Sequence, residues 1–245
     1  MTHPPFPRLA VAPLFGGLLM LAACSGGHAP AADVAQQQAA AKAQAASANL
    51  DTYRQLLRIG NDEMAVSMGQ DIVRRFPQSA AAAEVRKTLP DVEKRYRETS
   101  EKNRLAQLWL YQVAPMQGGT QSTATIQSSK PGGSDSVRLI LRRHTDWGQS
   151  VFLYGTAPGF VCRGNCTIKA TVDGKPVGIT AFAPPSGEPA LMIRDDRKFL
   201  TLLHGARKIT MDVTLVDGEK KETLLYEVGG FDPAKWQKLD KPKKK

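Results

Sequence analysis

The most compact group of residues with chemical potential is His144-Thr145-Asp146-Trp147, which brings a base, an acid and an aromatic ring together. On a β-strand, side chains two residues apart point to the same side, so His144 and Asp146 would share a face there. Hydrolysis also needs a nucleophile, and the sequence contains no Gly-x-Ser-x-Gly elbow, phosphate-binding loop or HExxH motif. We interpret the group as a polar turn, with a hydrolase site as the less favoured alternative, and predict a protein that is not an enzyme.

Cys24 follows a short apolar segment behind a basic start. Arg8 is the only fixed side-chain charge before it, and the uncharged run 9–23 is shorter than the roughly 18–20 residues that cross a bilayer. Such a run is typical of a cleaved secretory signal, here residues 1–23. Its end, Leu21-Ala22-Ala23-Cys24, resembles the lipobox of bacterial lipoproteins. This resemblance implies cleavage before Cys24 and diacylglycerol on its sulfur; the alternative is an ordinary signal peptide with a chance cysteine.

The lipoprotein resemblance also implies a location. Ser25 stands where an aspartate would retain an enteric lipoprotein in the inner membrane. By that analogy we expect an outer-membrane anchor, with the protein facing the periplasm. A single acyl chain binds membranes only marginally, whereas additional chains make the attachment effectively permanent.

The other two cysteines, Cys162 and Cys166, lie four residues apart in Phe-Val-Cys-Arg-Gly-Asn-Cys-Thr. The glycine and asparagine between them tolerate the tight turn that brings such a pair within bridging distance. In the oxidising periplasm we predict a disulfide, with a redox pair or a metal site as alternatives. A metal site needs further ligands at suitable spacing, and the folded region offers only His144 and His204. We therefore predict no metal and no cofactor.

The formal net charge of +10 is unevenly distributed along the chain. Residues 231–245 contain six lysines and two aspartates, a net charge of +4. A secreted chain rarely meets nucleic acid, and no recognition motif is present, so we expect no nucleic-acid partner. An anionic envelope polymer is a candidate counter-surface for this tail, and a solvated end that aids solubility is the alternative. The lysines concerned are Lys238, Lys241, Lys243, Lys244 and Lys245.

Other polar and aromatic residues have structural interpretations. Asp195 or Asp196 can cap a helix over 197–203 that ends at Gly205, and His204 lies at its end, where a cation is favourable. We expect the larger aromatic side chains in the core and at its rim, rather than in a sugar-binding platform. These are Trp109, Tyr111, Trp147, Phe152 and Tyr154.

The elements that position these residues fall into two parts, and the first is helical. An Ala/Gln-rich tether over 24–48 leads into residues 49–104, where large apolar side chains recur at helical spacing. We predict four helices there, with Asp62 and Ser79 as caps and Pro90 at the start of the fourth. The joint Arg-Arg-Phe-Pro-Gln-Ser-Ala-Ala-Ala-Ala-Glu resembles tetratricopeptide-type hairpins of periplasmic lipoproteins. Because only about one and a half repeats are present, a small hairpin packed on the next domain is the alternative.

The second part, residues 105–230, is mainly β. Apolar residues alternate there with a period of two, as in half-buried antiparallel strands. Asp173-Gly174 and Asp217-Gly218 are hairpin signals, and the proline-rich segment 183–189 is a loop. We predict an α+β protein in which TPR-like helical hairpins precede an antiparallel, β-sandwich-like domain with one helix. The candidate strands are 108–113, 122–127, 137–142, 150–154, 166–172, 175–182, 190–193, 209–216 and 222–228.

Several segments of this second part resemble an uncharacterised group of secreted proteobacterial proteins, and more faintly accessory proteins of type VI secretion. They are Trp147-Gly-Gln-Ser-Val, Phe160-Val-Cys with Cys166, Val172-Asp-Gly, Arg194-Asp-Asp with Phe199-Leu, and Tyr226-Glu-Val-Gly-Gly-Phe. Neither resemblance assigns a catalytic residue. We expect a membrane-anchored lipoprotein that holds a protein partner in the cell envelope. Binding of a glycan or anionic polymer, such as peptidoglycan or lipopolysaccharide, is the alternative.

Overall fold

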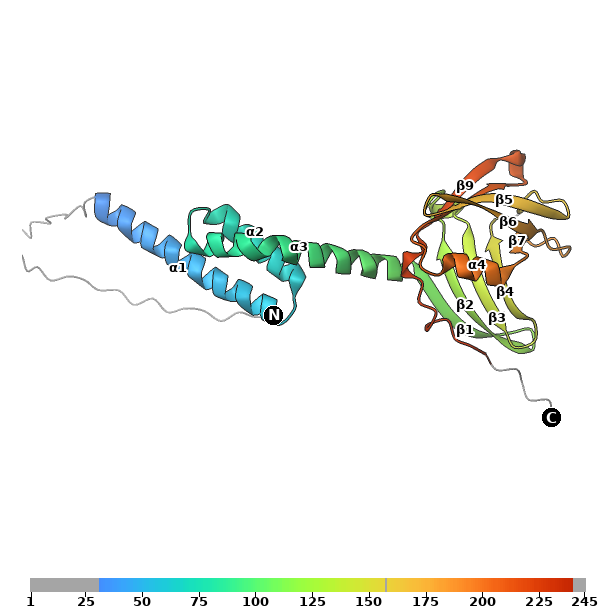
Figure 1. Cartoon of the computed structure of the whole chain (residues 1–245), viewed down its shortest axis with the longest axis horizontal. Helices are drawn as coiled ribbons and strands as arrows, with labels where there is room; N and C mark the ends of the chain where they lie inside the picture. Colours follow the sequence, from blue (N-terminus) through green and yellow to red (C-terminus); the bar gives the residue numbers. More distant parts are fainter. Residues whose placement is uncertain (1–30, 157, 240–245) are drawn as a thin grey trace, which may run out of the picture.

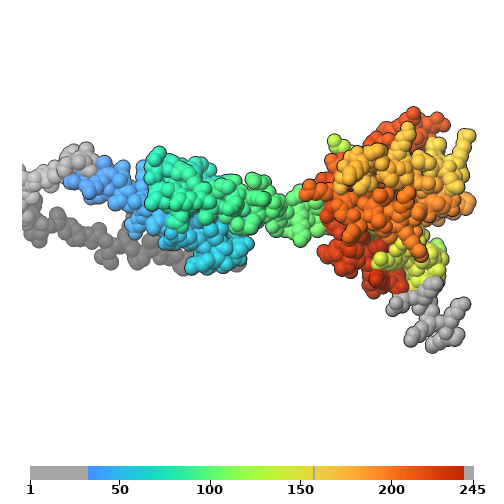
Figure 2. Space-filling model, viewed as in Figure 1, coloured from blue at the N-terminus to red at the C-terminus, as the bar shows by residue number. Residues whose placement is uncertain are grey.

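One long helix joins the two parts of the molecule. The structure is a computed structural model that describes residues 31–156 and 158–239. A helical module and a β domain lie at opposite ends (Figure 1), and the space-filling view shows two lobes with a narrow neck (Figure 2). The chain is therefore α+β, as predicted. The helices are α1 (Ala31–Arg58), α2 (Asp62–Arg75), α3 (Ala80–Gln107) and, in the β domain, α4 (Asp196–Leu203).

The helical module has its own small core, built where α1, α2 and α3 cross. α1 begins inside the segment expected as a tether, but its side chains are exposed over 33–45 and the core begins at Ala46. Gly69 of α2 lies at the crossing. A Cβ atom there would approach Leu89 Cδ1 to 2.9 Å and Tyr53 Cε2 to 3.0 Å, so the lack of a side chain at Gly69 lets residues of α1 and α3 pack closely against α2.

α3 runs without a break through Pro90, so the prediction of two separate helices was wrong. Proline removes one helical hydrogen bond, and its ring crowds the carbonyl of residue i−4, which is Arg86. Pro90 and Arg86 are both exposed, so water can solvate that carbonyl group. Val85 and Val92 are buried on either side of the proline, and this packing offsets its cost.

The helix caps follow the expected chemistry, with one shift. Ser79 caps α3 as predicted, since Ala82 N–H donates to its Oγ at 3.1 Å. Asp195 likewise caps α4, with Lys198 N–H donating to Oδ1 at 2.9 Å. For α2 the cap is Asn61 rather than Asp62, because Met64 N–H donates to Asn61 Oδ1 at 3.1 Å.

The β domain is a single sheet of nine antiparallel strands in the order β1-β2-β3-β4-β7-β6-β5-β8-β9. All nine predicted strands are present, with their ends shifted by a few residues. The strands are β1 (Trp109–Met116), β2 (Gly119–Gln127), β3 (Arg138–His144), β4 (Gly148–Tyr154), β5 (Asn165–Val172), β6 (Lys175–Phe182), β7 (Ala190–Ile193), β8 (Ile209–Thr214) and β9 (Lys221–Tyr226).

The sheet curls until β9 meets the segment that follows β2. Leu225 N–H donates to Lys130 O at 2.8 Å, and Ser129 N–H donates to Leu225 O at 2.7 Å. Strands β1–β4 and strands β5–β9 thereby enclose one core. α4 covers one open side of this core, into which Phe199 and Leu203 are packed (Figure 1). The largest fully buried side chains of this core are Ile126, Leu139, Leu141, Leu153, Phe199, Leu203, Ile209, Met211, Leu224 and Tyr226.

The two Asp-Gly pairs form turns of different length. Asp173 and Gly174, with φ values of 48° and 82°, connect β5 and β6 directly, as predicted. Gly218 lies in the longer connection 215–220 between β8 and β9. The second signal therefore correctly predicted a hairpin, although the hairpin is wider than a two-residue turn.

Part of the expected Lys-rich tail, 231–245, packs into the β domain. Trp236 is 2% exposed, and its Nε1–H donates to Ser122 O at 3.1 Å. The Arg143 guanidinium lies 3.6 Å from the Trp236 ring centroid and donates to the Trp236 carbonyl at 2.6 Å. Asp232 N–H donates to Tyr111 Oη at 2.7 Å. The segment that ends at Trp236 therefore seals the core beneath β1–β3.

Candidate functional site: the outer cleft of the β domain

The predicted disulfide between Cys162 and Cys166 is present. Its Cα atoms are 5.6 Å apart, and Gly164 in the turn between them has a φ of 65°. The preceding backbone is tied to β8, because Val161 N–H donates to Thr214 O at 2.8 Å. The bridge therefore fixes a surface turn against the sheet. Among the described residues, no group of histidine, cysteine, aspartate or glutamate side chains has the arrangement of a metal site.

His144 is a buried structural residue at the end of β3, where the turn to β4 begins. Its Nδ1 accepts from the N–H groups of Asp146 and Trp147 at 3.1 and 3.3 Å, and its Nε2 lies 3.0 Å from Met116 O. The Trp147 ring stacks on the imidazole with centroids 3.9 Å apart. Both ring nitrogens are thus engaged by backbone groups of two neighbouring hairpins. This geometry supports the interpretation as a polar turn.

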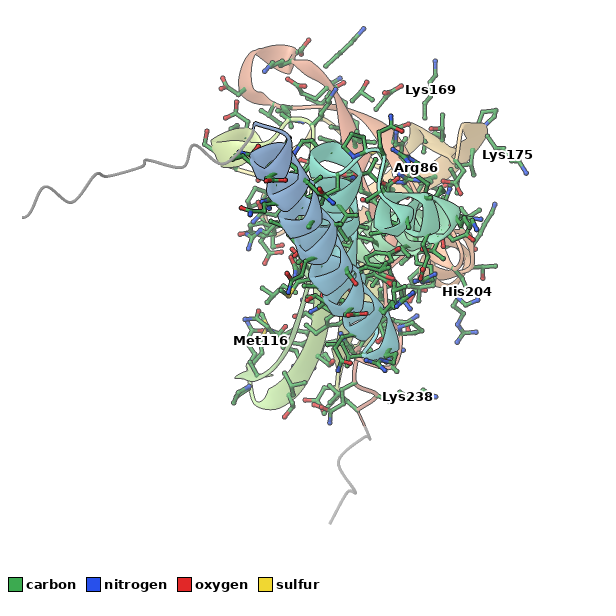
Figure 3. The ribbon with its side chains drawn as sticks, turned by 90° about the vertical axis from the view of Figure 1, so that its left-hand side faces the viewer. Arg86, Met116, Lys169, Lys175, His204 and Lys238 are labelled. Atoms are coloured by element: carbon green, nitrogen blue, oxygen red, sulfur yellow. A yellow bond between two sulfur atoms is a disulfide. The ribbon has the colours of Figure 1, made fainter. Side chains whose placement is uncertain are left out.

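The tail lysine Lys238 lies apart from two lysines of the sheet. Figure 3 shows Lys169 and Lys175 on one side of the domain and Lys238 at the opposite end. Lys238 is exposed. Cys24, the signal peptide and the lysines Lys241, Lys243, Lys244 and Lys245 lie outside the described residues. In the part of the chain that is described, no helix has the length and apolar character needed to cross a bilayer.

An open cleft of about 410 Å³ lies on the outer face of β1–β4 and β7. Its floor is a row of cross-strand neighbours, in which Ile140 pairs with Phe152 and Phe152 pairs with Met192. Arginines flank this row on both sides along β3. We name this surface the outer cleft. It is lined by Gln112, Met116, Gln121, Thr123, Thr125, Arg138, Ile140, Arg142, Phe152, Tyr154, Glu188, Ala190 and Met192.

Each arginine of the outer cleft is held over an aromatic ring. Arg138 lies 4.8 Å from the centroid of Tyr154, its cross-strand partner. Arg142 lies 5.0 Å from the centroid of Phe152, and its Nε–H donates to Ser150 Oγ at 3.1 Å. Cation–π contact of this kind fixes the position of a guanidinium without using its N–H donors.

The two guanidinium groups have no carboxylate partner within the described residues. The ion pairs found there involve other basic residues, for example Arg54 with Glu84 and Arg95 with Asp62, each at 2.7 Å. Partial burial lowers the pKa of the Arg142 guanidinium, an effect that the carboxylate of Glu188 opposes from a longer distance. Desolvation of a cation without a paired anion is unfavourable, so a carboxylate bound here would offset the cost of desolvating the Arg142 guanidinium.

The sequence prediction missed this cleft, although a signal for it exists. Arg138, Ile140 and Arg142 occupy alternate positions of β3, opposite to the buried Leu139 and Leu141. This alternation places both arginines on the outer face. The rings beneath them come from β4, however, and only the pairing register of β3 with β4 brings the two sets together.

Comparisons with known proteins add no relative. No family model, no curated protein and no solved structure matches the chain.

Proposed function

We propose that this protein is a lipid-anchored lipoprotein of the cell envelope that holds a protein partner on its β domain and is not an enzyme. The lipobox-like sequence at Cys24 supports the anchor. The disulfide between Cys162 and Cys166 agrees with an oxidising compartment such as the periplasm. Outer-membrane attachment facing the periplasm rests on the analogy at Ser25.

The separation of the two parts is the observation that carries this proposal. α3 has 28 residues, a length of about 42 Å at 1.5 Å per residue. Its side chains are exposed over 97–104, as expected for a helix that bridges two folded parts. α3 thus holds the β domain away from the helical module, whose first described element is α1 (Figure 1).

The join between α3 and the β domain is well defined, which a spacer requires. Arg104 donates to Glu101 and Glu227, with N–O distances of 2.7 Å to each. Hydrogen bonds with Glu101, then with Glu227, raise the pKa of Arg104. Trp109 Nε1–H donates to Val228 O at 3.3 Å. These contacts favour an oriented β domain over a loosely tethered one.

The finer features of the fold belong to the proposal as well. We interpret α2, the joint over 76–79 and the start of α3 as a TPR-like hairpin. The helical module has three helices, which is fewer than the array of repeats that forms a peptide groove contains. The β domain is interpreted as sandwich-like, because two halves of one curled sheet face each other across a shared core. Partner binding is therefore assigned to the β domain.

Crosslinking in living cells tests the proposed function. We expect the full-length protein to capture a defined envelope protein reproducibly. Cys24→Ala should lose that product, because an unlipidated chain would no longer be held at the membrane. Recovery of no envelope protein by the native form would contradict the proposal.

A second candidate function is binding of an anionic envelope polymer, and the exposed cationic side chains of Arg138 and Lys238 favour it. We expect the protein to co-sediment with purified cell wall. Salt should weaken this co-sedimentation, and deletion of residues 238–245 should abolish it. Absence of sedimentation at low salt would remove this candidate. Sedimentation that survives the deletion would remove the role of the tail lysines.

A further inference from the structure

We propose that the outer cleft binds an extended acidic peptide segment of the pattern acidic–x–apolar–x–acidic. This inference rests on the proposed function, because it specifies the chemistry of the protein partner. The two carboxylates would engage Arg138 and Arg142, and the apolar side chain between them would rest on Ile140 and Met192, which flank the nearly buried Phe152.

The spacing of the arginines sets the spacing of the ligand. Arg138 and Arg142 lie four residues apart on one strand, a separation of about 13 Å. An extended peptide has the same rise, so residues i and i+4 of the ligand match the two guanidinium groups. Residue i+2 then lies over Ile140, which is midway between them. Positions i+1 and i+3 point away from the sheet and remain unrestricted.

The donors of the two arginines suit carboxylates. Arg142 uses its Nε–H on Ser150, and its other N–H groups have no acceptor in the described part of the chain. The Arg138 guanidinium lies over the Tyr154 ring and has no hydrogen-bond partner there. A guanidinium held over a ring presents its remaining donors in one plane, and this geometry matches a carboxylate bidentately.

The rest of the lining favours a peptide over a sugar polymer. Amide and hydroxyl side chains of Gln112, Gln121, Thr123 and Thr125 come from the neighbouring strands β1 and β2. They can bond the backbone groups of an extended peptide. Met192 supplies an adaptable apolar surface of the kind that is common where proteins bind peptides, whereas Phe152 is only 8% exposed and offers no free platform for a sugar.

Fluorescence anisotropy with two labelled peptides of equal composition tests the pattern. The full-length chain should bind Thr-Glu-Thr-Leu-Thr-Glu-Thr, whose acidic and apolar side chains share one face. It should bind Thr-Thr-Glu-Leu-Glu-Thr-Thr at least several-fold more weakly, because that peptide points its acids and its leucine to opposite faces. Equal affinity for both peptides would overturn the proposed spacing, and tighter binding of oligogalacturonate would overturn the peptide in favour of an acidic glycan.

Three substitutions assign the binding to the cleft. Arg142→Gln should weaken the first peptide about tenfold, as expected for loss of a charge-assisted bidentate contact. Arg163→Gln removes the same charge from the exposed disulfide turn and should leave affinity unchanged. Glu188→Gln removes the competing carboxylate of the cleft and should tighten binding, a gain that misfolding would not produce. If neither Arg142→Gln nor Glu188→Gln changes the affinity for the first peptide, the outer cleft is not the binding site.

In-cell crosslinking of the Arg142→Gln variant separates this inference from the function on which it rests. If the native protein captures an envelope partner and the variant does not, both proposals are supported. If both capture the same partner equally, the outer cleft is not the binding site, but the scaffolding function stands. If neither captures one, the scaffolding function itself is contradicted.

Discussion

At the scale of single residues, Tyr226 shows how the β domain accommodates a polar group in its core. The side chain is fully buried, and its hydroxyl donates to Val137 O at 3.2 Å. Burial raises the pKa of the phenol above its ordinary value, because the charged form would lose its hydration. The tyrosine therefore stays neutral in the folded protein at a pH where the unfolded chain begins to lose the proton.

This difference predicts a loss of stability in alkali. Above about pH 10 the unfolded chain releases the Tyr226 proton and the folded chain retains it, so the free energy of unfolding falls as pH rises. The slope from this group approaches about 1.4 kcal/mol per pH unit. Denaturant titrations between pH 8 and 11 measure it.

Tyr226→Phe is the matched control for that measurement. It removes the titrating hydroxyl while it keeps the ring, so its stability should fall less steeply with pH than that of the native protein. At neutral pH it should cost about 1 kcal/mol for the lost hydrogen bond to Val137. Parallel pH profiles for the two proteins would show that Tyr226 does not contribute.

A second residue-scale prediction concerns the seal over the core. Trp236→Ala should destabilise the β domain by roughly 3–5 kcal/mol, because a large buried side chain is lost together with its hydrogen bond to Ser122. Lys238→Ala, two residues further on and exposed, should change the free energy of unfolding little. Thermal unfolding monitored by tryptophan fluorescence compares the two variants. Similar small effects would mean that residues 231–239 are not part of the folded domain.

At the scale of elements, the join between α3 and the β domain depends on Gly230. A Cβ atom at this position would clash with the backbone C and O atoms of Leu105, so a side chain cannot fit without displacing the end of α3. Neighbouring Gly229 is different, since its nearest contact would be Leu105 Cδ1 at 3.4 Å. The two glycines therefore form a natural test pair.

Gly230→Ala should separate α3 from the turn Val228–Gly230 and destabilise the protein by roughly 1–3 kcal/mol, as overpacking does. Gly229→Ala should have a much smaller effect. The unfolding midpoint measures the loss of stability, and small-angle X-ray scattering measures the change in shape. Equal behaviour of the two variants would contradict the described join.

The predictable part of this fold consists of the elements that are specified by a pattern within their own stretch of sequence. Strands such as β5 and β8 alternate buried and less buried residues within their own sequence, so a local pattern could locate them. Pro90 misled the prediction, because packing of Val85 and Val92 on both sides of it decides that α3 continues. The strand order and the closure of Lys130 on Leu225 join residues far apart in the chain, and no local pattern encodes them. The outer cleft was missed for the same reason.

At the scale of the whole molecule, the parts suit a single task. A lipid on Cys24 would fix one end, α3 would carry the β domain away from it, and the outer cleft would meet the partner. The proposed anchor is central, because the compartment and the distance over which α3 acts both follow from it.

The most direct test of this account is intact-mass spectrometry of the protein purified from its native membranes, with tandem analysis of the first residues. We predict a chain that begins at Cys24 and carries a diacylglycerol thioether and an acylated amino terminus. An unmodified amino terminus, or recovery of the protein from the soluble cytoplasmic fraction, would contradict the account.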